Sequence, residues 1–205
     1  SDSAVKRFVV VARCGCRRRA VTMRNVIRAI LVVLVVSAGC AAPVAAGPFE
    51  DGLAAYDHGD YATALRLLRP LAEQGHAESQ IRLALIYNYG FGVAQNDTEA
   101  VRWYQLAAEQ GNTTAQYYLG IIYEFGQGVP RDYSEAVKWF RLAAEQGYAR
   151  AQVGLGFIYE HGRGVLLDYV QAHRWYDLAS THYSASENED RARAVRNRDA
   201  VAAKM

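Results

Sequence analysis

The histidines, the cysteines and the glycine-rich loops of this chain are the features whose residue types and spacing could form a metal, phosphate or catalytic site. None of the histidines has the H-E-x-x-H spacing and no cysteine follows residue 46, so a zinc site has little basis. The G-x-G loops at Gly90, Gly126 and Gly162 lack a third glycine and follow no predicted strand, which indicates turns, not phosphate cradles. No G-x-S-x-G or S-x-x-K sequence is present. We therefore predict no catalytic residue, no metal, no cofactor and no enzyme activity.

Other residues recur with a fixed period, which indicates a repeat architecture. The three tryptophans are separated by two intervals of 36 residues, and tyrosines and glycines recur with them. The set is Trp103, Trp139, Trp175, Tyr87, Tyr123, Tyr159, Gly90, Gly126 and Gly162. A period between about 20 and 50 residues is typical of a solenoid. Solenoids expose a long curved surface, so we predict a binding scaffold.

Each repeat reads as two helices joined by a short turn. In the second copy, Ala115, Leu119 and Ile122 are spaced to form one apolar helical face, which ends at Gly126. Asp132 and Glu135 have the spacing of a capping box, which predicts the start of the second helix. We expect the repeated tryptophans to fill the core between units. A small residue such as Gly120 is expected where a neighbouring backbone comes close.

This pattern resembles the Sel-like repeat (SLR) family, which is related to tetratricopeptide repeats. The motif A-x-x-x-L-G-x-x-Y-x-x-G-x-G-V-x-x-D-x-x-x-A-x-x-W-x-x-x-A-A-E-Q-G is met almost completely from Ala115 to Gly147. The resemblance implies an all-α, right-handed α/α solenoid with a C-terminal capping helix. The predicted parts are a leader (1–46), a degenerate N-terminal capping repeat (47–75), repeats at 76–111, 112–147 and 148–183, and the capping helix (184–205).

The leader differs from the repeats in charge and hydropathy. Residues 1–46 hold eight of the 23 Lys and Arg and one of the 21 Asp and Glu, so the rest is mildly acidic and nucleic acid is not an expected partner. A basic stretch, an apolar run from Ala29 to Ala38 and small residues before Gly47 predict a signal peptide, cut after Ala46, with Met23 as its natural start. We therefore expect a periplasmic or secreted protein of the bacterial envelope.

Two alternatives for the leader stay open. Residues 29–49 carry no charge and are about long enough to cross a bilayer, so they are a candidate membrane anchor. Cys40 ends a sequence that resembles a lipobox, the motif before a lipid-modified cysteine. Membrane contact is expected only through an uncleaved leader or a lipidated Cys40.

The resemblance places the candidate binding site on the concave face, which the first helix of each pair lines in tetratricopeptide-like stacks. The non-motif positions of those helices vary between copies and carry residues typical of interaction hot spots. They are Arg82, Leu85, Tyr89, Tyr118, Ile121, Phe125, Phe157 and His161. We predict that the protein is an exported scaffold that binds a peptide or protein segment on this face.

Two other functions are alternatives to the scaffold. Some cysteine-rich SLR proteins bind or hydrolyse β-lactams, and an envelope enzyme of that kind is the first alternative. The paired cysteines on which that activity is expected to depend are absent here. The second alternative is a purely structural spacer in a membrane complex.

Overall fold

The computed structural model describes residues 47–205, which contain α-helices and no strand. The helices are α2 (Pro48–Asp57), α3 (Tyr61–Glu73), α4 (Ala77–Tyr89), α5 (Asp97–Glu109), α6 (Thr113–Phe125), α7 (Tyr133–Glu145), α8 (Ala149–His161), α9 (Tyr169–His182) and α10 (Asn188–Ala202). The predicted all-α repeat solenoid is confirmed. The expected leader, with its cut after Ala46 and with Cys40, lies outside the described residues, as does most of the candidate anchor. Within residues 47–205, no helix is long and apolar enough to cross a membrane.

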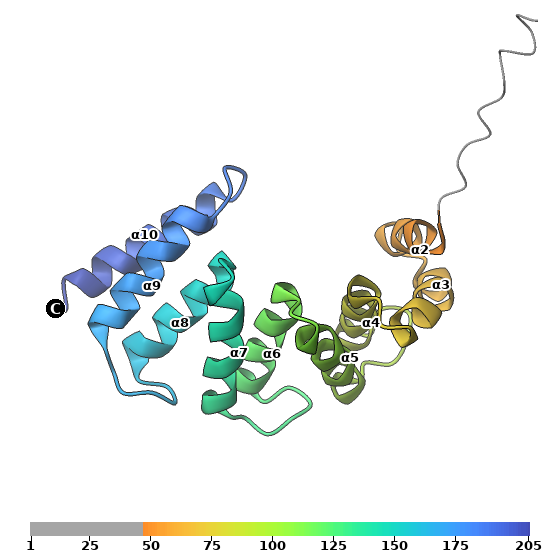
Figure 1. The fold of residues 1–205 in the computed structure, drawn as a ribbon, viewed down its shortest axis with the longest axis horizontal. Helices are drawn as coiled ribbons and strands as arrows, with labels where there is room; N and C mark the ends of the chain where they lie inside the picture. The colour runs from red at the N-terminus through yellow and green to blue at the C-terminus, as the bar shows by residue number, and fades with distance from the viewer. Residues whose placement is uncertain (1–46) are drawn as a thin grey trace, which may run out of the picture. The chain divides into compact units, whose positions relative to one another are not determined.

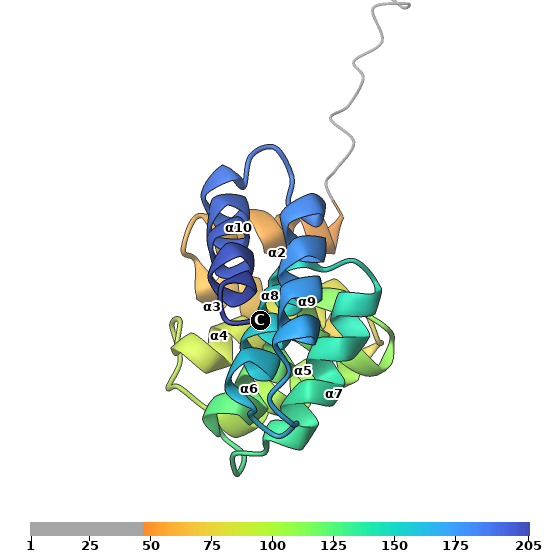
Figure 2. The same cartoon turned by 90° about the vertical axis from the view of Figure 1, so that its left-hand side faces the viewer.

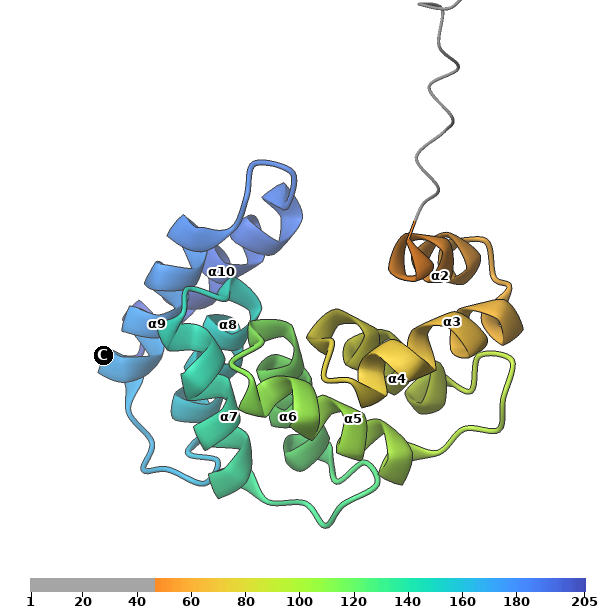
Figure 3. The ribbon, with the colours of Figure 1, turned by 45° about the vertical axis from the view of Figure 1, so that its right-hand side comes forward.

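Successive helices pair and the pairs stack along a curve. α2 packs with α3, α4 with α5, α6 with α7, and α8 with α9, and each pair also contacts the next through its neighbouring helices. Figures 1 and 3 show the pairs following one another around an arc. Figure 2 shows the end of the stack, where α10 lies beside α9. α10 thus covers the last pair, in the place where a further first helix would pack.

The second helices begin at their predicted caps, but the hydrogen bonds differ from those of a capping box. The Asp132 carboxylate accepts from the backbone N–H groups of Ser134 and Glu135, at 2.8 and 3.1 Å. Its own N–H donates to the Tyr123 carbonyl, at 2.9 Å, and Glu135 pairs with Lys138 instead of reaching back. The reciprocal half of the predicted box is therefore wrong. The N–H of the cap ties the second helix to a carbonyl that the end of the first helix leaves free.

The core between the helices is filled by the residue after each tryptophan. Tyr104, Phe140 and Tyr176 are fully buried, whereas Trp139 and Trp175 are only half-buried. A Cβ on Gly120 would lie 2.5 Å from the Phe140 ring. The small residue thus admits an aromatic ring of its own repeat, not a neighbouring backbone as expected. The tryptophans, apart from buried Trp103, flank the core instead of filling it.

The second glycine of each G-x-G loop packs the loop against the preceding repeat. Gly164 has a φ of +68°, and a Cβ there would lie 2.6 Å from the Tyr133 Cβ, at the start of α7. Gly128 makes the same approach to Asp97, at the start of α5, with 2.7 Å between the added Cβ and the Asp97 Cβ. These loops therefore connect repeats as well as reversing the chain.

A row of buried glutamines provides a second connection between repeats. Gln80, Gln116 and Gln152 donate through Nε2 to the carbonyls of Ala72, Ala108 and Ala144, at 2.9, 3.2 and 2.9 Å. The Gln116 Oε1 accepts from the Gln146 Nε2 at 2.9 Å, and Gln80 accepts from Gln110 in the same way. Each glutamine therefore satisfies a carbonyl at the end of the preceding repeat. Their 36-residue spacing was the sequence signal for this role.

Candidate functional site

The eight candidate binding residues are divided by the structure into exposed and half-buried groups. Tyr89 and Phe125 have 58% and 64% of their surface exposed, and His161 is exposed as well. The other five candidates are half-buried; they are Arg82, Leu85, Tyr118, Ile121 and Phe157. Of these, Leu85, Tyr118 and Ile121 pack against the core. The exposed three are at the C-terminal ends of the first helices.

Two of these helix ends carry different clusters. Tyr89 stacks on Phe91 with 5.4 Å between ring centroids, and Phe91 stacks on Tyr61 at 4.9 Å. The His161 ring lies 4.2 Å from the Phe157 ring, and the Arg163 guanidinium lies 4.6 Å from the centre of that same ring. We call the edge of the solenoid that carries the G-x-G loops the loop edge. It therefore presents a different surface in each of these repeats.

Arg82 is held in place by its neighbours. Its Nη2 lies 3.2 Å from the Glu78 Oε1, and its guanidinium lies 5.1 Å from the centre of the Tyr56 ring. Its Nε is buried and has no hydrogen-bond partner among residues 47–205. The Arg82 side chain is thus held in one position, and the Glu78 carboxylate partly neutralises its charge.

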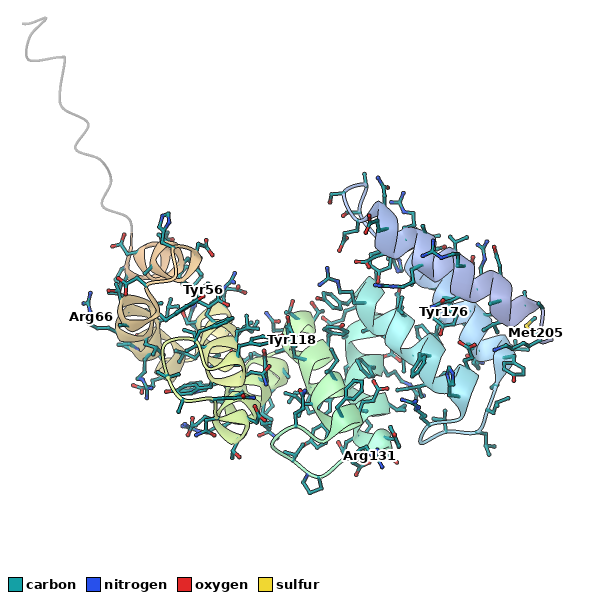
Figure 4. The ribbon with its side chains drawn as sticks, turned by 180° about the vertical axis from the view of Figure 1, so that it is seen from behind. Tyr56, Arg66, Tyr118, Arg131, Tyr176 and Met205 are labelled. Carbon is teal, nitrogen blue, oxygen red and sulfur yellow. The ribbon has the colours of Figure 1, made fainter. Side chains whose placement is uncertain are left out.

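Tyrosines that were not among the candidates join Tyr118 in a continuous aromatic group. Ring centroids are 5.0 Å apart for Tyr104 and Tyr118, 5.6 Å for Tyr117 and Tyr118, and 5.3 Å for Tyr117 and Tyr148. We call Tyr104, Tyr117, Tyr118 and Tyr148 the tyrosine band. Figure 4 shows Tyr118 and Tyr56 on the inner side of the curve, which we call the inner surface. The rest of the band adjoins it through contacts with Tyr118, and Arg82 adjoins it through Tyr56.

Three hydroxyls of the band, those of Tyr104, Tyr117 and Tyr118, have raised pKa values and stay protonated at neutral pH. Burial, with a contribution from Tyr148, raises the pKa of Tyr117 to about 12. Burial also raises the pKa of Tyr118, and that of Tyr104 rises for the same reason. Neutral phenols donate and accept hydrogen bonds but are poor bases. The chemistry of the band is therefore that of binding.

A cleft adjoins the band at its C-terminal side. It has a volume of about 280 Å³ and is lined by Tyr117, Arg150, Val153, Tyr183, Asp190 and Arg193. The Arg150 side chain is 48% exposed, and its Nη2 lies 3.6 Å from Glu187 and 3.9 Å from Asp190. Because Asp190 and Arg193 belong to α10, the capping helix forms one wall of this cleft. Arg150 and the cleft were missed because their walls come from different parts of the chain.

Lys204, which follows α10, reproduces a contact that a repeat loop makes. The Arg163 Nη1 lies 3.2 Å from the Glu124 Oε1, and its guanidinium lies 5.9 Å from the centre of the Tyr133 ring. One repeat later, the Lys204 Nζ lies 2.8 Å from the Glu160 Oε1 and 5.7 Å from the centre of the Tyr169 ring. Lys204 therefore takes the place of the loop arginine at the end of the described stack.

These two equivalent glutamates have opposite pKa shifts. Burial outweighs the pull of Arg163 and raises the pKa of Glu124 above its ordinary 4.5. Burial also acts on Glu160, but the hydrogen bonds from Lys204 and Tyr176 outweigh it and lower the pKa of Glu160. A raised folded-state pKa makes a carboxyl lose stabilisation as pH rises through it, whereas a lowered pKa makes stability fall as pH falls through it.

We therefore expect Glu124→Gln and Glu160→Gln to change the pH dependence of unfolding in opposite ways. As pH falls below 4.5, the ordinary pKa of the group, the unfolding free energy of Glu160→Gln should decrease less than that of the wild type. As pH rises above that value, the unfolding free energy of Glu124→Gln should decrease less than that of the wild type. Urea denaturation between about pH 3 and pH 7 measures both effects. Parallel curves for the two variants would contradict the assignment.

In the part of the chain from residue 47 onward, no group of three or more His, Cys, Asp or Glu side chains gathers as a metal site. The features described on the inner surface are the tyrosine band and the Arg150 cleft. Both consist of aromatic rings and hydrogen-bonding groups.

Comparison with known proteins gives four matches to one family model, the Sel1 repeat, at residues 49–76, 77–112, 113–148 and 149–183. A Sel1 repeat protein from Oxalobacter formigenes is similar in structure, with a TM-score of 0.63 and 36% identity, over 67% of this chain and 55% of that one. A protective antigen of uropathogenic Escherichia coli with an SLR fold has a TM-score of 0.64 and 42% identity, over 67% of this chain and 30% of the antigen.

A third relative is an exopolysaccharide production negative regulator of Rhizobium meliloti (strain 1021). It is 45% identical over 56 residues, which are 27% of this chain and 21% of the regulator. The chain therefore spans between about a fifth and about half of the length of these relatives.

Proposed function

Because this chain belongs to the Sel1 repeat family, whose members generally mediate protein–protein interactions, we propose that it is an exported scaffold binding a peptide or protein segment on its inner surface. Solenoids of this kind use their extended curved faces for binding. The scaffolds of this family are typically non-enzymatic. The signal-like order of residues in the leader supports export.

The observation that carries the proposal is the tyrosine band with the adjoining Arg150 cleft. Tyrosine and arginine are enriched among the residues that dominate binding energy at interfaces. A tyrosine side chain has only two χ angles, so it makes a large contact at a low cost in conformational entropy. Exposed Tyr89 and Phe125 extend the same kind of surface toward the loop edge.

The experiment compares the two sides of the solenoid. Tyr89→Ala with Phe125→Ala, and separately Arg150→Ala, change exposed side chains of the first helices. Leu106→Ala with Leu142→Ala is the matched control, because both leucines are partly exposed on second helices. Cross-linking and recovery from the native envelope should yield a partner with the wild type and the control, and much less with the first two variants.

Circular dichroism checks that all variants remain folded. Recovery of the same partner by folded Tyr89→Ala/Phe125→Ala and Arg150→Ala variants would contradict the proposed surface. Loss of the partner only in the leucine control would place the interface on the second helices.

A further inference from the structure

We propose that the tyrosine band and the Arg150 cleft bind a proline-containing peptide segment in the polyproline II conformation. This inference rests on the proposed function and specifies the chemistry of the bound segment. It follows from three features of the inner surface: hydroxyls without partners, carboxylates that are already paired, and a helix start that lacks a capping side chain.

The first feature is a set of unused hydrogen-bond donors. Within residues 47–205, the hydroxyls of Tyr104, Tyr117, Tyr118 and Tyr148 make no hydrogen bond, and that of Tyr104 is completely buried. Elsewhere in the stack, the Tyr159 hydroxyl bonds to Arg141 and the Tyr176 hydroxyl to Glu160, both at 2.9 Å. Three tyrosine hydroxyls of the stack are therefore paired with other side chains, whereas the four of the band are not.

The second feature is that the nearby acceptors are occupied. Glu187 and Asp190 face Arg150, Asp190 also pairs with Arg193, and Glu78 pairs with Arg82. The groups left over on this surface are phenol hydroxyls and the remaining N–H groups of the arginines. A fitting ligand therefore supplies acceptors and brings little charge.

A proline-containing segment meets both requirements. Proline has no backbone N–H, and the polyproline II helix makes no internal hydrogen bonds, so its carbonyls are free to accept. Its rings pack against aromatic side chains, and proline-rich segments bind aromatic-lined grooves at a low entropic cost. In this arrangement proline rings lie against the faces of Tyr117 and Tyr148, while Arg150 and the hydroxyls of the band other than buried Tyr104 donate to peptide carbonyls.

The third feature is Tyr148 itself, which occupies the N-cap position of α8 without capping it. The equivalent residues His76 and Asn112 accept from the N–H groups of Ser79 and Ala115, at 3.3 and 3.1 Å. Asparagine is among the preferred N-cap residues, and a tyrosine cannot replace that bond. Departures from a local rule are expected at functional sites. The ring of Tyr148 instead packs against Tyr117, which lines the cleft.

An acidic peptide fits this surface less well, because Arg82 and Arg150 already face carboxylates. Acidic binding would need these ion pairs to be replaced. It is therefore an outcome that the experiment must be able to detect.

The test measures fluorescence anisotropy of labelled peptides with the full chain. The probes are decaproline, a Gly-Ser decapeptide and a Glu-rich decapeptide. Decaproline should bind, and the other two should bind at least about tenfold more weakly. Tyr118→Phe removes one hydroxyl and should weaken decaproline binding by about 3- to 10-fold, which corresponds to one lost hydrogen bond. Tyr159→Phe is the matched control and should leave the affinity unchanged, because that hydroxyl bonds to Arg141.

Tyr148→Asn separates binding from folding. It should restore a capping side chain to α8, as in α6, and so keep the thermal midpoint at or near that of the wild type. The same change should weaken decaproline binding, since the ring beside the cleft is lost.

Several results would overturn the inference. They are no binding of decaproline, tighter binding of the Glu-rich peptide, equal effects of Tyr118→Phe and Tyr159→Phe, or a decaproline affinity that Tyr148→Asn leaves unchanged. If decaproline fails while the native partner is still lost in the Tyr89→Ala/Phe125→Ala or Arg150→Ala variants, the inference fails and the proposed function stands. If those variants recover the partner, the proposed function fails with it.

Discussion

Phe140→Ala is expected to lower the free energy of unfolding by about 3 to 5 kcal/mol, the usual cost of removing a buried aromatic side chain. Phe140 is 1% exposed, and its ring lies against Gly120 of α6 and Gly154 of α8. A cavity at this point would loosen two consecutive repeats at once. Because neighbouring units stabilise each other in a solenoid, the loss should spread beyond α7. Urea denaturation followed by circular dichroism measures it.

Trp139→Ala is the comparison for this prediction. Trp139 carries the repeated motif but is only half-buried, so less apolar surface is lost when it is removed. We expect a clearly smaller decrease in unfolding free energy than for Phe140→Ala. A larger loss for Trp139→Ala would restore the sequence-based view of the tryptophan as the centre of the core.

Gly164→Ala is expected to destabilise the protein by about 2 to 4 kcal/mol, from two additive causes. A left-handed backbone costs a non-glycine residue about 1 to 2 kcal/mol, and the φ of Gly164 is +68°. The new Cβ would also lie 2.8 Å from the Tyr133 carbonyl carbon, so the loop would have to move away from α7. Thermal or urea denaturation gives the size of the effect.

Gly147→Ala isolates the first of these causes. Gly147 has a φ of +85°, but a Cβ there meets nothing within 4 Å. We expect it to show only the backbone cost, about 1 to 2 kcal/mol. Equal losses at Gly147 and Gly164 would mean that the loop adjusts freely and does not hold the repeats together.

The helix pairs could be predicted from the sequence because their determinants are local and periodic. Gly126 ends α6 in the left-handed conformation, with φ +73°, and Asp132 caps α7, and both roles depend on neighbouring residues. The 36-residue recurrence then indicated stacking, because such units bury their apolar faces only against each other. The pattern did not reveal which aromatic residue is buried. Trp139 and Phe140 are adjacent and both apolar, and the direction of each is set by how the helices cross.

Which residues meet on the inner surface was decided by the tertiary structure. Tyr118 was a candidate because it lies at a variable position, but its contact with Tyr104 depends on how α5 packs against α6. Tyr148 occupies a capping position in the sequence, and its ring meets Tyr117 only because α8 follows α6 in the stack. Arg150 meets the carboxylates of Glu187, just before α10, and of Asp190 within it, 37 and 40 residues further along the chain. Local sequence determines helix limits because those interactions span a few residues, whereas a binding surface combines side chains from separate repeats, whose relative positions are set by packing.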